Sequence, residues 1–231
     1  LGQVNKNPEE AYEKIIDTAE KHMKDFQTGV NWDYLRRVAC NPEYTLNRYV
    51  TSIVKDLHPN VLKTTLMNLG FEALYNGTKT IREMRKIHNC NIPWIILMDP
   101  TSACNLHCAG CWSGTYGHKY SLSFEDMDKI VTEGKELGTY LYMLTGGEPT
   151  VRMKDIFRLA EKHHDAYFAL YTNSTLINDE MCQEVVRLGN ITFMLSIEGT
   201  PETNDARRGE GHYAAVMNAM DLLKKYGIVF G

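Results

Sequence analysis

The sequence predicts an α/β fold in which a parallel sheet of repeated βα units follows a helical N-terminal region. Two observations support this prediction. From Pro93 onward, short apolar runs that suit buried strands alternate with segments whose apolar residues recur at helical spacing. Up to about Asn91, the pattern is helical. Repeated βα units normally form parallel sheets. Since the pattern changes at this point, we divide the chain into a helical region, residues 1–91, and an α/β core, residues 92–231.

The N-terminal region contains three segments with helical periodicity. The first has these apolar residues at helical spacing: Ile15, Ile16, Ala19, Met23 and Phe26. The second begins at Pro59, which suits the first turn of a helix. The third begins at Thr78, a residue that can cap a helix. We find no cluster of catalytic residues here, and interpret the region as a packing or cap element.

The core contains five predicted strands with helices between them. The strands are expected at 94–98, 140–144, 166–171, 191–195 and 228–230. Ser123 and Asp126 predict a capping box at the start of the first helix. Gly189 and Gly227 are expected to end two later helices. Active sites on parallel sheets lie at the carboxyl ends of the strands, so functional residues are expected in the segments that follow each strand.

Composition excludes several classes of protein. The chain of 231 residues is 43% hydrophobic, which suffices for one sizeable domain. Its net charge of -4 is spread along the chain without a basic stripe, so we expect no nucleic-acid partner. No apolar run approaches the roughly 18 residues of a transmembrane segment. Three cysteines cluster while Cys40, Cys90 and Cys182 are scattered, which favours a metal site and a reducing compartment, the cytoplasm.

The clustered cysteines follow the first predicted strand. Cys104, Cys108 and Cys111 are separated by three and then two residues. A loop with this spacing can place three thiolates around a [4Fe–4S] cubane and leave one iron open for a chelating ligand. The alternative is a structural zinc site completed by His107 or His118. Structural zinc sites usually show two short Cys/His pairs, and a second pair is missing, so we favour iron–sulfur.

Polar segments also follow the next three predicted strands. After the second strand, Gly146 and Gly147 let the backbone approach a ligand closely, and the Glu148 carboxylate can neutralise an ammonium group. The segments after the third and fourth strands contribute Thr172, Asn173, Ser196, Glu198, Arg207 and Arg208. A turn or a helix cap explains each segment alone. Their succession at one edge of the sheet, beside the cysteines, predicts a binding site.

Taken in order, these segments resemble the radical S-adenosylmethionine (SAM) superfamily. The matching patterns are CxxxCxxC at 104–111, GGEP at 146–149, Thr-Asn-x-Thr-Leu at 172–176 and Ser-x-Glu-Gly at 196–199. The resemblance covers residues 93–231 and implies a partial (β/α)6 barrel after the helical region. The pattern is most similar to members with a C-terminal auxiliary-cluster (SPASM-type) region and to lipid-modifying members.

The resemblance implies an enzyme with two cofactors, a [4Fe–4S] cluster and SAM. Gly146, Gly147 and Glu148 would hold the amino end of SAM, and Thr172, Asn173 and Ser196 would line its ribose and methionyl part. Arg208 would pair with the SAM carboxylate, with Arg207 as the competing choice. One electron would split SAM into methionine and a 5′-deoxyadenosyl radical, which abstracts hydrogen from a substrate. The implied partners are a one-electron donor such as flavodoxin or ferredoxin, and a peptide, lipid or other small-molecule substrate.

Two positions depart from the family pattern. The residue before the third cysteine is often an aromatic residue that packs near the adenine, and here it is Gly110. We expect the adenine contact either to shift to Trp112 or to be lost. The family's Ser-x-Asp-Gly is Ser-x-Glu-Gly here, so Glu198 keeps the carboxylate of this SAM-site position on a longer arm.

Two other functions remain open at this point. A non-enzymatic iron–sulfur electron-transfer protein would explain the cysteines but not the GGEP segment. A zinc-binding interaction module would explain neither that segment nor the βα repeat. Among residues outside the site, we expect Cys182 to behave as a small buried hydrophobe. We expect His163 and His164 to be solvated at a helix end, where the helix dipole favours a positive charge.

The extent of the chain also leads to an expectation. The fifth predicted strand starts at Ile228, and the resemblance calls for a sixth βα unit. The chain begins with Leu1 rather than methionine. We therefore expect a longer native protein, in which a further C-terminal part closes the barrel and contacts the substrate. The competing account has the N-terminal helices cover the opening.

Overall fold

The computed structural model describes residues 8–24, 29–117 and 119–231. Phe26 and His118, both named above, lie outside the described residues. The chain divides into two compact units, residues 1–59 and 60–231. The boundary near residue 91 that the sequence suggests stays a prediction.

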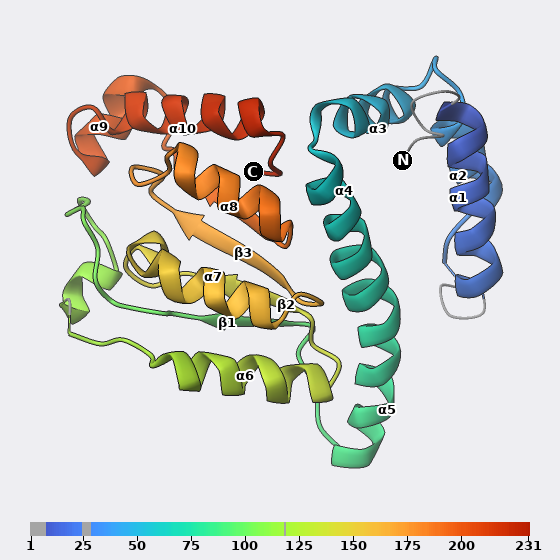
Figure 1. The fold of residues 1–231 in the computed structure, drawn as a ribbon, viewed down its shortest axis with the longest axis horizontal. Coiled ribbons are helices and arrows are strands. Elements are labelled where there is room, and N and C mark those ends of the chain that lie inside the picture. Colours follow the sequence, from blue (N-terminus) through green and yellow to red (C-terminus); the bar gives the residue numbers. More distant parts are fainter. Residues whose placement is uncertain (1–7, 25–28, 118) are drawn as a thin grey trace. The chain divides into compact units, whose positions relative to one another are not determined.

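The first unit consists of helices in its described part (Figure 1). They are α1 (Pro8–Met23), α2 (Trp32–Ala39) and α3 (Thr45–Asp56). Arg36 of α2 joins two of them: its Nη2 lies 2.8 Å from Oδ1 of Asp17 and also contacts the carboxylate of Glu20. The hydroxyls of Tyr12 and Thr51, 3.0 Å apart, join α1 to α3. The predicted helical character of this segment is confirmed.

A continuous helical rod begins the second unit. It comprises α4 (Pro59–Thr65), the π-helix η1 (Leu66–Gly77) and α5 (Thr78–His88). Pro59 starts the rod as predicted. The helix α5 begins at Thr78 as predicted, but Thr78 does not cap it, because Gly77 and Thr78 both have right-handed helical dihedrals and the rod continues through them. The Thr78 hydroxyl donates to the carbonyl of Ala73 at 3.3 Å, so the residue lies inside the rod.

The rod packs against the amino ends of the strands. The side-chain amide of Asn68 donates to the carbonyls of His164 and Ala166, at 2.6 and 2.9 Å. Gly77 permits the closest approach, since a Cβ there would lie 2.3 Å from the carbonyl oxygen of Gly138. These contacts lie at the edge of the sheet opposite to the one where the sequence predicts the binding site.

The sheet of the second unit is parallel, which confirms the predicted fold class. Its strands are β1 (Ile95–Met98), β2 (Leu141–Leu144), β3 (Tyr167–Thr172) and β4 (Ile191–Leu195), in the order β1-β2-β3-β4. Each agrees with the predicted strand to within one residue at either end. Phe230 forms an isolated parallel bridge with Phe193, where the fifth strand was predicted.

Helices connect the strands and run alongside the sheet (Figure 1). The longer ones are α6 (Phe124–Glu136), α7 (Met153–Lys162), α8 (Asp179–Leu188) and α10 (His212–Tyr226). Shorter helices are η2 (Ser113–Tyr116), η3 (Pro149–Arg152) and α9 (Pro201–Arg208). The capping box of Ser123 and Asp126 is confirmed. Gly189 and Gly227 end α8 and α10 with φ angles of 79° and 62°, a left-handed conformation that favours glycine.

The two faces of the sheet differ in burial. Tyr142, Phe168 and Phe193 are fully buried in the core with residues of the connecting helices. On the opposite face, Leu97 is 58% and Tyr171 41% exposed. Side chains alternate between faces along a strand, so the second set points away from the helix-covered core. Cys182 is buried in that core as expected, and burial raises the pKa of its thiol to about 11.

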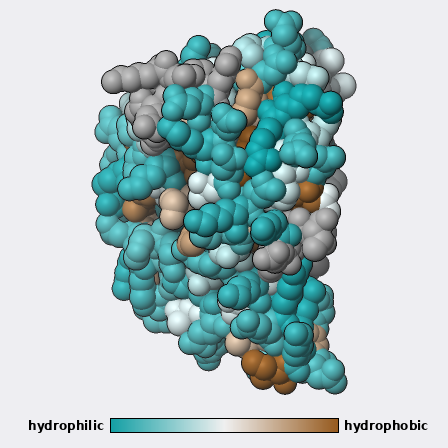
Figure 2. Space-filling view, turned by 90° about the vertical axis from the view of Figure 1, so that its right-hand side faces the viewer, coloured by the Kyte–Doolittle hydropathy of each residue, from teal (hydrophilic) through white to brown (hydrophobic). Residues whose placement is uncertain are grey.

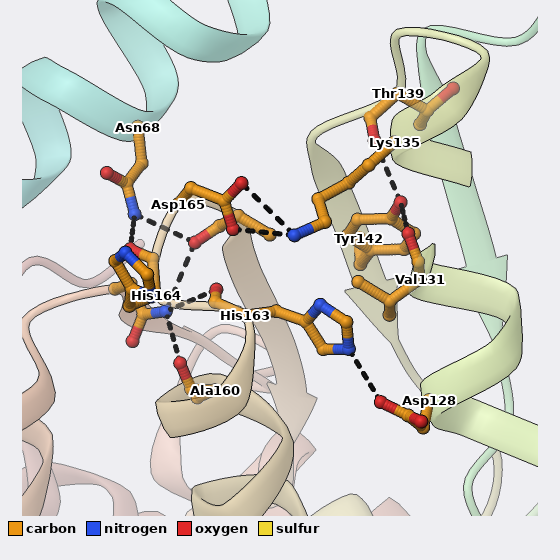
Figure 3. Close-up of polar contacts among 12 residues, drawn as sticks. Asn68, Asp128, Val131, Lys135, Thr139, Tyr142, Ala160, His163, His164 and Asp165 are labelled. Carbon is orange, nitrogen blue, oxygen red and sulfur yellow. Dashed lines mark hydrogen bonds and ion pairs between the residues drawn. The ribbon is translucent and has the colours of Figure 1, made fainter. Parts of the chain in front are cut away.

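A buried polar cluster lies beside the core, near the carboxyl ends of α6 and α7 (Figure 3). His163 is only 3% exposed, and its Nε2 lies 2.9 Å from Oδ1 of Asp128. Burial lowers the pKa of this imidazole. The prediction that His163 is solvated is therefore wrong, because packing of α7 against α6 covers the ring; His164 is exposed as expected. Nearby, Nζ of Lys135 lies 2.8 Å from Oδ1 of Asp165.

Within the described ranges, no helix is long and apolar enough to cross a membrane. Figure 2 shows one face of the molecule, on which hydrophilic residues predominate and hydrophobic residues form only small separate patches.

Candidate active site

A cavity of about 420 Å³ opens at the carboxyl ends of the strands. We call it the strand-end cavity. Its lining residues are Leu97, Cys104, Cys108, Cys111, Trp112, Met143, Thr145, Gly146, Gly147, Glu148, Tyr171, Thr172, Asn173, Ser196, Arg207 and Arg208. The structure thus brings together every residue that the sequence suggested for this site except Glu198.

The cysteine loop, residues 104–111, forms one wall of the cavity. The Leu106 N–H donates to Sγ of Cys104 at 3.4 Å, and Nδ2 of Asn173 lies 3.9 Å from the same sulfur. Burial raises the pKa of this thiol. Three thiols from one loop that face one cavity, with N–H donors beside a sulfur, fit the donor set of an iron–sulfur cluster. Within the described part of the chain, no three His, Cys, Asp or Glu side chains converge on a single metal position.

The two glycines of the GGEP segment lie against the backbone that leads into the cysteine loop. Gly146 has a φ of 100°, a backbone conformation that would be strained in a residue with a side chain. A Cβ on Gly147 would lie 2.2 Å from the carbonyl oxygen of Ala103. The N–H groups of Gly147 and Glu148 donate to the carbonyls of Thr101 and Ala103, both at 2.8 Å. The glycines therefore permit the cysteine loop to be hydrogen-bonded directly to the end of β2.

The Glu148 carboxylate is 1% exposed and bonded to protein donors. Its Oε1 accepts from the N–H and hydroxyl of Thr150, at 3.0 and 2.5 Å, and from the hydroxyl of Thr172 at 2.7 Å. Its Oε2 accepts from the N–H of Asn173 at 2.7 Å. Glu148 therefore joins the ends of β2 and β3 across the floor of the cavity. Its contact with the SAM amino group stays a prediction.

Glu198 does not line the cavity, but it holds two arginines that do. Its Oε1 accepts from Nη2 and Nε of Arg208, at 2.6 and 3.0 Å, and its Oε2 lies 2.8 Å from Nη1 of Arg207. The arginines hold the pKa of the Glu198 carboxyl below its usual range. Arg208 is the less exposed of the pair. A direct contact of Glu198 with SAM stays a prediction, and the observed geometry orients both guanidinium groups.

Trp112 is 60% exposed and lies between two cavities. It lines the strand-end cavity and a neighbouring cavity of about 570 Å³, which Asp99 and Tyr120 also line. The indole is thus available for contact with a planar ligand, although its packing on adenine stays a prediction.

Sequence reasoning missed several residues that support the site. Thr150 binds the Glu148 carboxylate, and Asn105 accepts from the Asn173 amide at 2.8 Å. Asn204 and His212 are buried behind Asn173. Thr150 directly follows the GGEP segment and Asn105 lies within the CxxxCxxC segment, so their positions in the sequence could have indicated a role in the site. Asn204 and His212 lie outside the motifs, and only the fold brings them to the site.

Comparison with known proteins agrees with this geometry. Residues 98–230 match the sequence profile of the radical SAM superfamily. The chain belongs to this superfamily, whose members are enzymes that use SAM and an iron–sulfur cluster.

Three relatives illustrate the range of similar proteins. The Fe-coproporphyrin III synthase of Methanosarcina barkeri is 29% identical over 59% of this chain and 35% of its own. The mycofactocin maturase MftC of Mycobacterium ulcerans is 30% identical over 61% of this chain and 39% of its own. The solved structure of anSMEcpe with bound AdoMet and Cp18Cys peptide is 26% identical, covers 59% of this chain and 41% of that one, and has a TM-score of 0.50. This chain spans between 32% and 42% of the length of the first curated relatives.

Proposed function

We propose that this protein reductively cleaves SAM at a [4Fe–4S] cluster held by Cys104, Cys108 and Cys111, and that the resulting radical abstracts hydrogen from a substrate. The observation that carries the proposal is the strand-end cavity, which the three cysteines share with the GGEP segment and two arginines. The cysteine loop is hydrogen-bonded to the end of β2 through Ala103 and Glu148, so the two motifs keep a fixed relative position.

Different residues of the cavity bind different parts of SAM. The backbone of Gly146 and Gly147 and the Glu148 side chain hold the amino end. Arg208 pairs with the SAM carboxylate, oriented by its two bonds to Glu198. The remaining contacts, with the ribose, methionyl and adenine groups, come from Thr172, Asn173, Ser196 and Trp112.

The protein supplies orientation and shelter to the reaction. When bound by the three cysteines and reduced, the cluster would supply the electron for the reductive cleavage of SAM. Leu97, Met143 and Tyr171 give the cavity an apolar wall beside the SAM site. A primary carbon radical reacts with whatever C–H group lies nearest, so the position in which the substrate binds beside SAM determines which hydrogen is abstracted.

We propose a peptide as the substrate, supported by the anSMEcpe structure that holds AdoMet and a peptide together. The second candidate is a small molecule, which the similarity to Fe-coproporphyrin III synthase favours. A flavodoxin or ferredoxin would supply the electron.

Anaerobic reconstitution tests the proposal. The wild type should bind about four irons in one cluster, and after reduction it should convert SAM to 5′-deoxyadenosine, measured by mass spectrometry. Cys108→Ala should lose most of the iron, whereas Cys182→Ala, in the core, should keep it. Equal iron in the two variants would refute the cluster assignment. A full cluster without SAM cleavage would favour an electron-transfer protein instead.

A further inference from the structure

His212, the first residue of α10, is a buried histidine with a partner at each ring nitrogen. It is 3% exposed. Its Nε2 lies 3.0 Å from the carbonyl oxygen of Asn173, and its Nδ1 lies 2.9 Å from the amide nitrogen of Asn204. A carbonyl oxygen only accepts and an amide nitrogen only donates. The proton therefore sits on Nε2, and the ring is held as the neutral Nε2–H tautomer.

The orientation of the Asn204 amide is fixed by its other contacts. Asn204 is fully buried. Its Oδ1 accepts from the N–H of Glu198 at 3.2 Å, and its Nδ2 also donates to Oδ1 of Asp205 at 3.0 Å. In the reversed orientation, the NH2 group of Asn204 would face the N–H of Glu198, and its oxygen would face the carboxylate of Asp205. Neither pair can form a hydrogen bond, because the first has two donors and the second has two acceptors. His212 is therefore connected through Asn204 to the segment that orients the two arginines.

On its other side, His212 holds a residue that faces the cysteine loop. The side-chain amide of Asn173 donates to Asn105 at 2.8 Å and lies 3.9 Å from Sγ of Cys104. The next residue, Ser174, has a φ of 70°, a conformation that residues other than glycine adopt only when their surroundings fix it. Glu148 holds the Asn173 N–H, and His212 holds the Asn173 carbonyl.

We propose that His212 is a positioning residue of the SAM site, which fixes the Asn173 side chain against the cysteine loop by donating to the Asn173 carbonyl. The inference rests on the proposed function, because it gives Asn173 a role beside the cluster and SAM. The neutral ring is required, since a proton on Nδ1 would point at the Asn204 amide donor. Burial and the charge of Arg208 lower the pKa of His212, against the opposing effects of the hydrogen bond to the Asn173 carbonyl and of the carboxylates of Asp205 and Glu198.

Three variants test this role in the reconstituted protein. His212→Ala removes the donor to Asn173. His212→Gln keeps an amide that can donate to Asn173 and accept from Asn204. His164→Ala removes an exposed histidine at the end of α7 and is the matched control. The measurements are the dissociation constant for SAM, by anaerobic calorimetry, and the midpoint potential of the cluster, by a titration followed with electron paramagnetic resonance.

We expect His212→Ala to bind SAM about tenfold more weakly, the effect of losing one hydrogen bond of typical strength. Its cluster potential should become more negative, because hydrogen bonds to the sulfurs set the potential of such clusters. His212→Gln should restore both quantities, and His164→Ala should match the wild type. A His212→Ala protein that is only less stable, with wild-type affinity and potential, would overturn the role. A wild type that binds no iron or no SAM would refute the proposed function instead.

A measurement on the wild-type apoprotein keeps the inference testable if His212→Ala does not fold. Nitrogen-15 NMR of the imidazole should show the neutral Nε2–H tautomer for His212 at neutral pH. A charged ring, or a proton on Nδ1, would contradict the hydrogen bond to the Asn173 carbonyl and overturn the proposal.

Discussion

Replacing Glu148 by alanine should destabilise the apoprotein as well as weaken SAM binding. The carboxylate is 1% exposed and accepts four hydrogen bonds, from Thr150, Thr172 and Asn173. A typical hydrogen bond contributes about 0.5–1.5 kcal/mol net, so the loss should lie at about 2–6 kcal/mol. Since a domain is stabilised by only about 5–15 kcal/mol, the effect should be easy to measure.

Urea unfolding of the apoprotein under reducing conditions, followed by far-UV circular dichroism, measures this loss. Glu136→Ala, an exposed carboxylate near the end of α6, is the control and should change the free energy of unfolding by less than about 0.5 kcal/mol. Glu148→Gln should fall between the two, because its amide oxygen still accepts while its NH2 group faces a donor. If Glu148→Ala unfolds with the wild-type free energy, the buried hydrogen bonds do not support the strand ends, and the reasoning fails.

Three further predictions concern the loop, the adenine contact and pH. Gly147→Ala should lower the iron bound on reconstitution, because its Cβ would lie 2.2 Å from the Ala103 carbonyl oxygen, whereas Gly70→Ala, whose Cβ would meet no atom within 4 Å, should keep it. Trp112→Ala should weaken SAM binding by about 1–3 kcal/mol in calorimetry, the value of stacking a base on an aromatic ring. Burial lowers the pKa of His163 below its ordinary value of 6.5, so the unfolded chain binds the proton at a higher pH than the folded protein does. The free energy of unfolding should therefore fall as the pH decreases below 6.5. His163→Gln should make the free energy of unfolding less dependent on pH in this range.

A specific experimental result would contradict each of these three predictions. Equal iron in the two glycine variants would show that the loop tolerates displacement. Unchanged SAM affinity in Trp112→Ala would place the adenine elsewhere. An unfolding profile of His163→Gln with the wild-type pH dependence would assign the effect to other groups, among which His212 acts in the same direction.

The motifs that follow the strands could be predicted from sequence because each is local. The cysteine spacing, the GGEP segment and the capping box of Ser123 and Asp126 are short, and their chemistry follows from residue types alone. The strands were found because fully buried parallel strands appear as short apolar runs. The prediction for His163 failed for the opposite reason, because packing of α7 against α6, which no local pattern records, buries the ring. Thr78 does not cap a helix because the rod that starts at Pro59 continues through it.

The sequence by itself therefore determined the fold class, the family and the set of residues that meet at the carboxyl edge of the sheet. Parallel strands bring their ends to one edge, so order along the chain translates directly into proximity. Only the tertiary structure decided how those residues are held. The bonds that Glu148 accepts from Thr172 and Asn173, the pairing of Glu198 with both arginines and the contact of His212 with Asn173 each join segments that are separate in sequence. Such contacts depend on the packing of whole helices against the sheet, and side-chain type does not encode them locally.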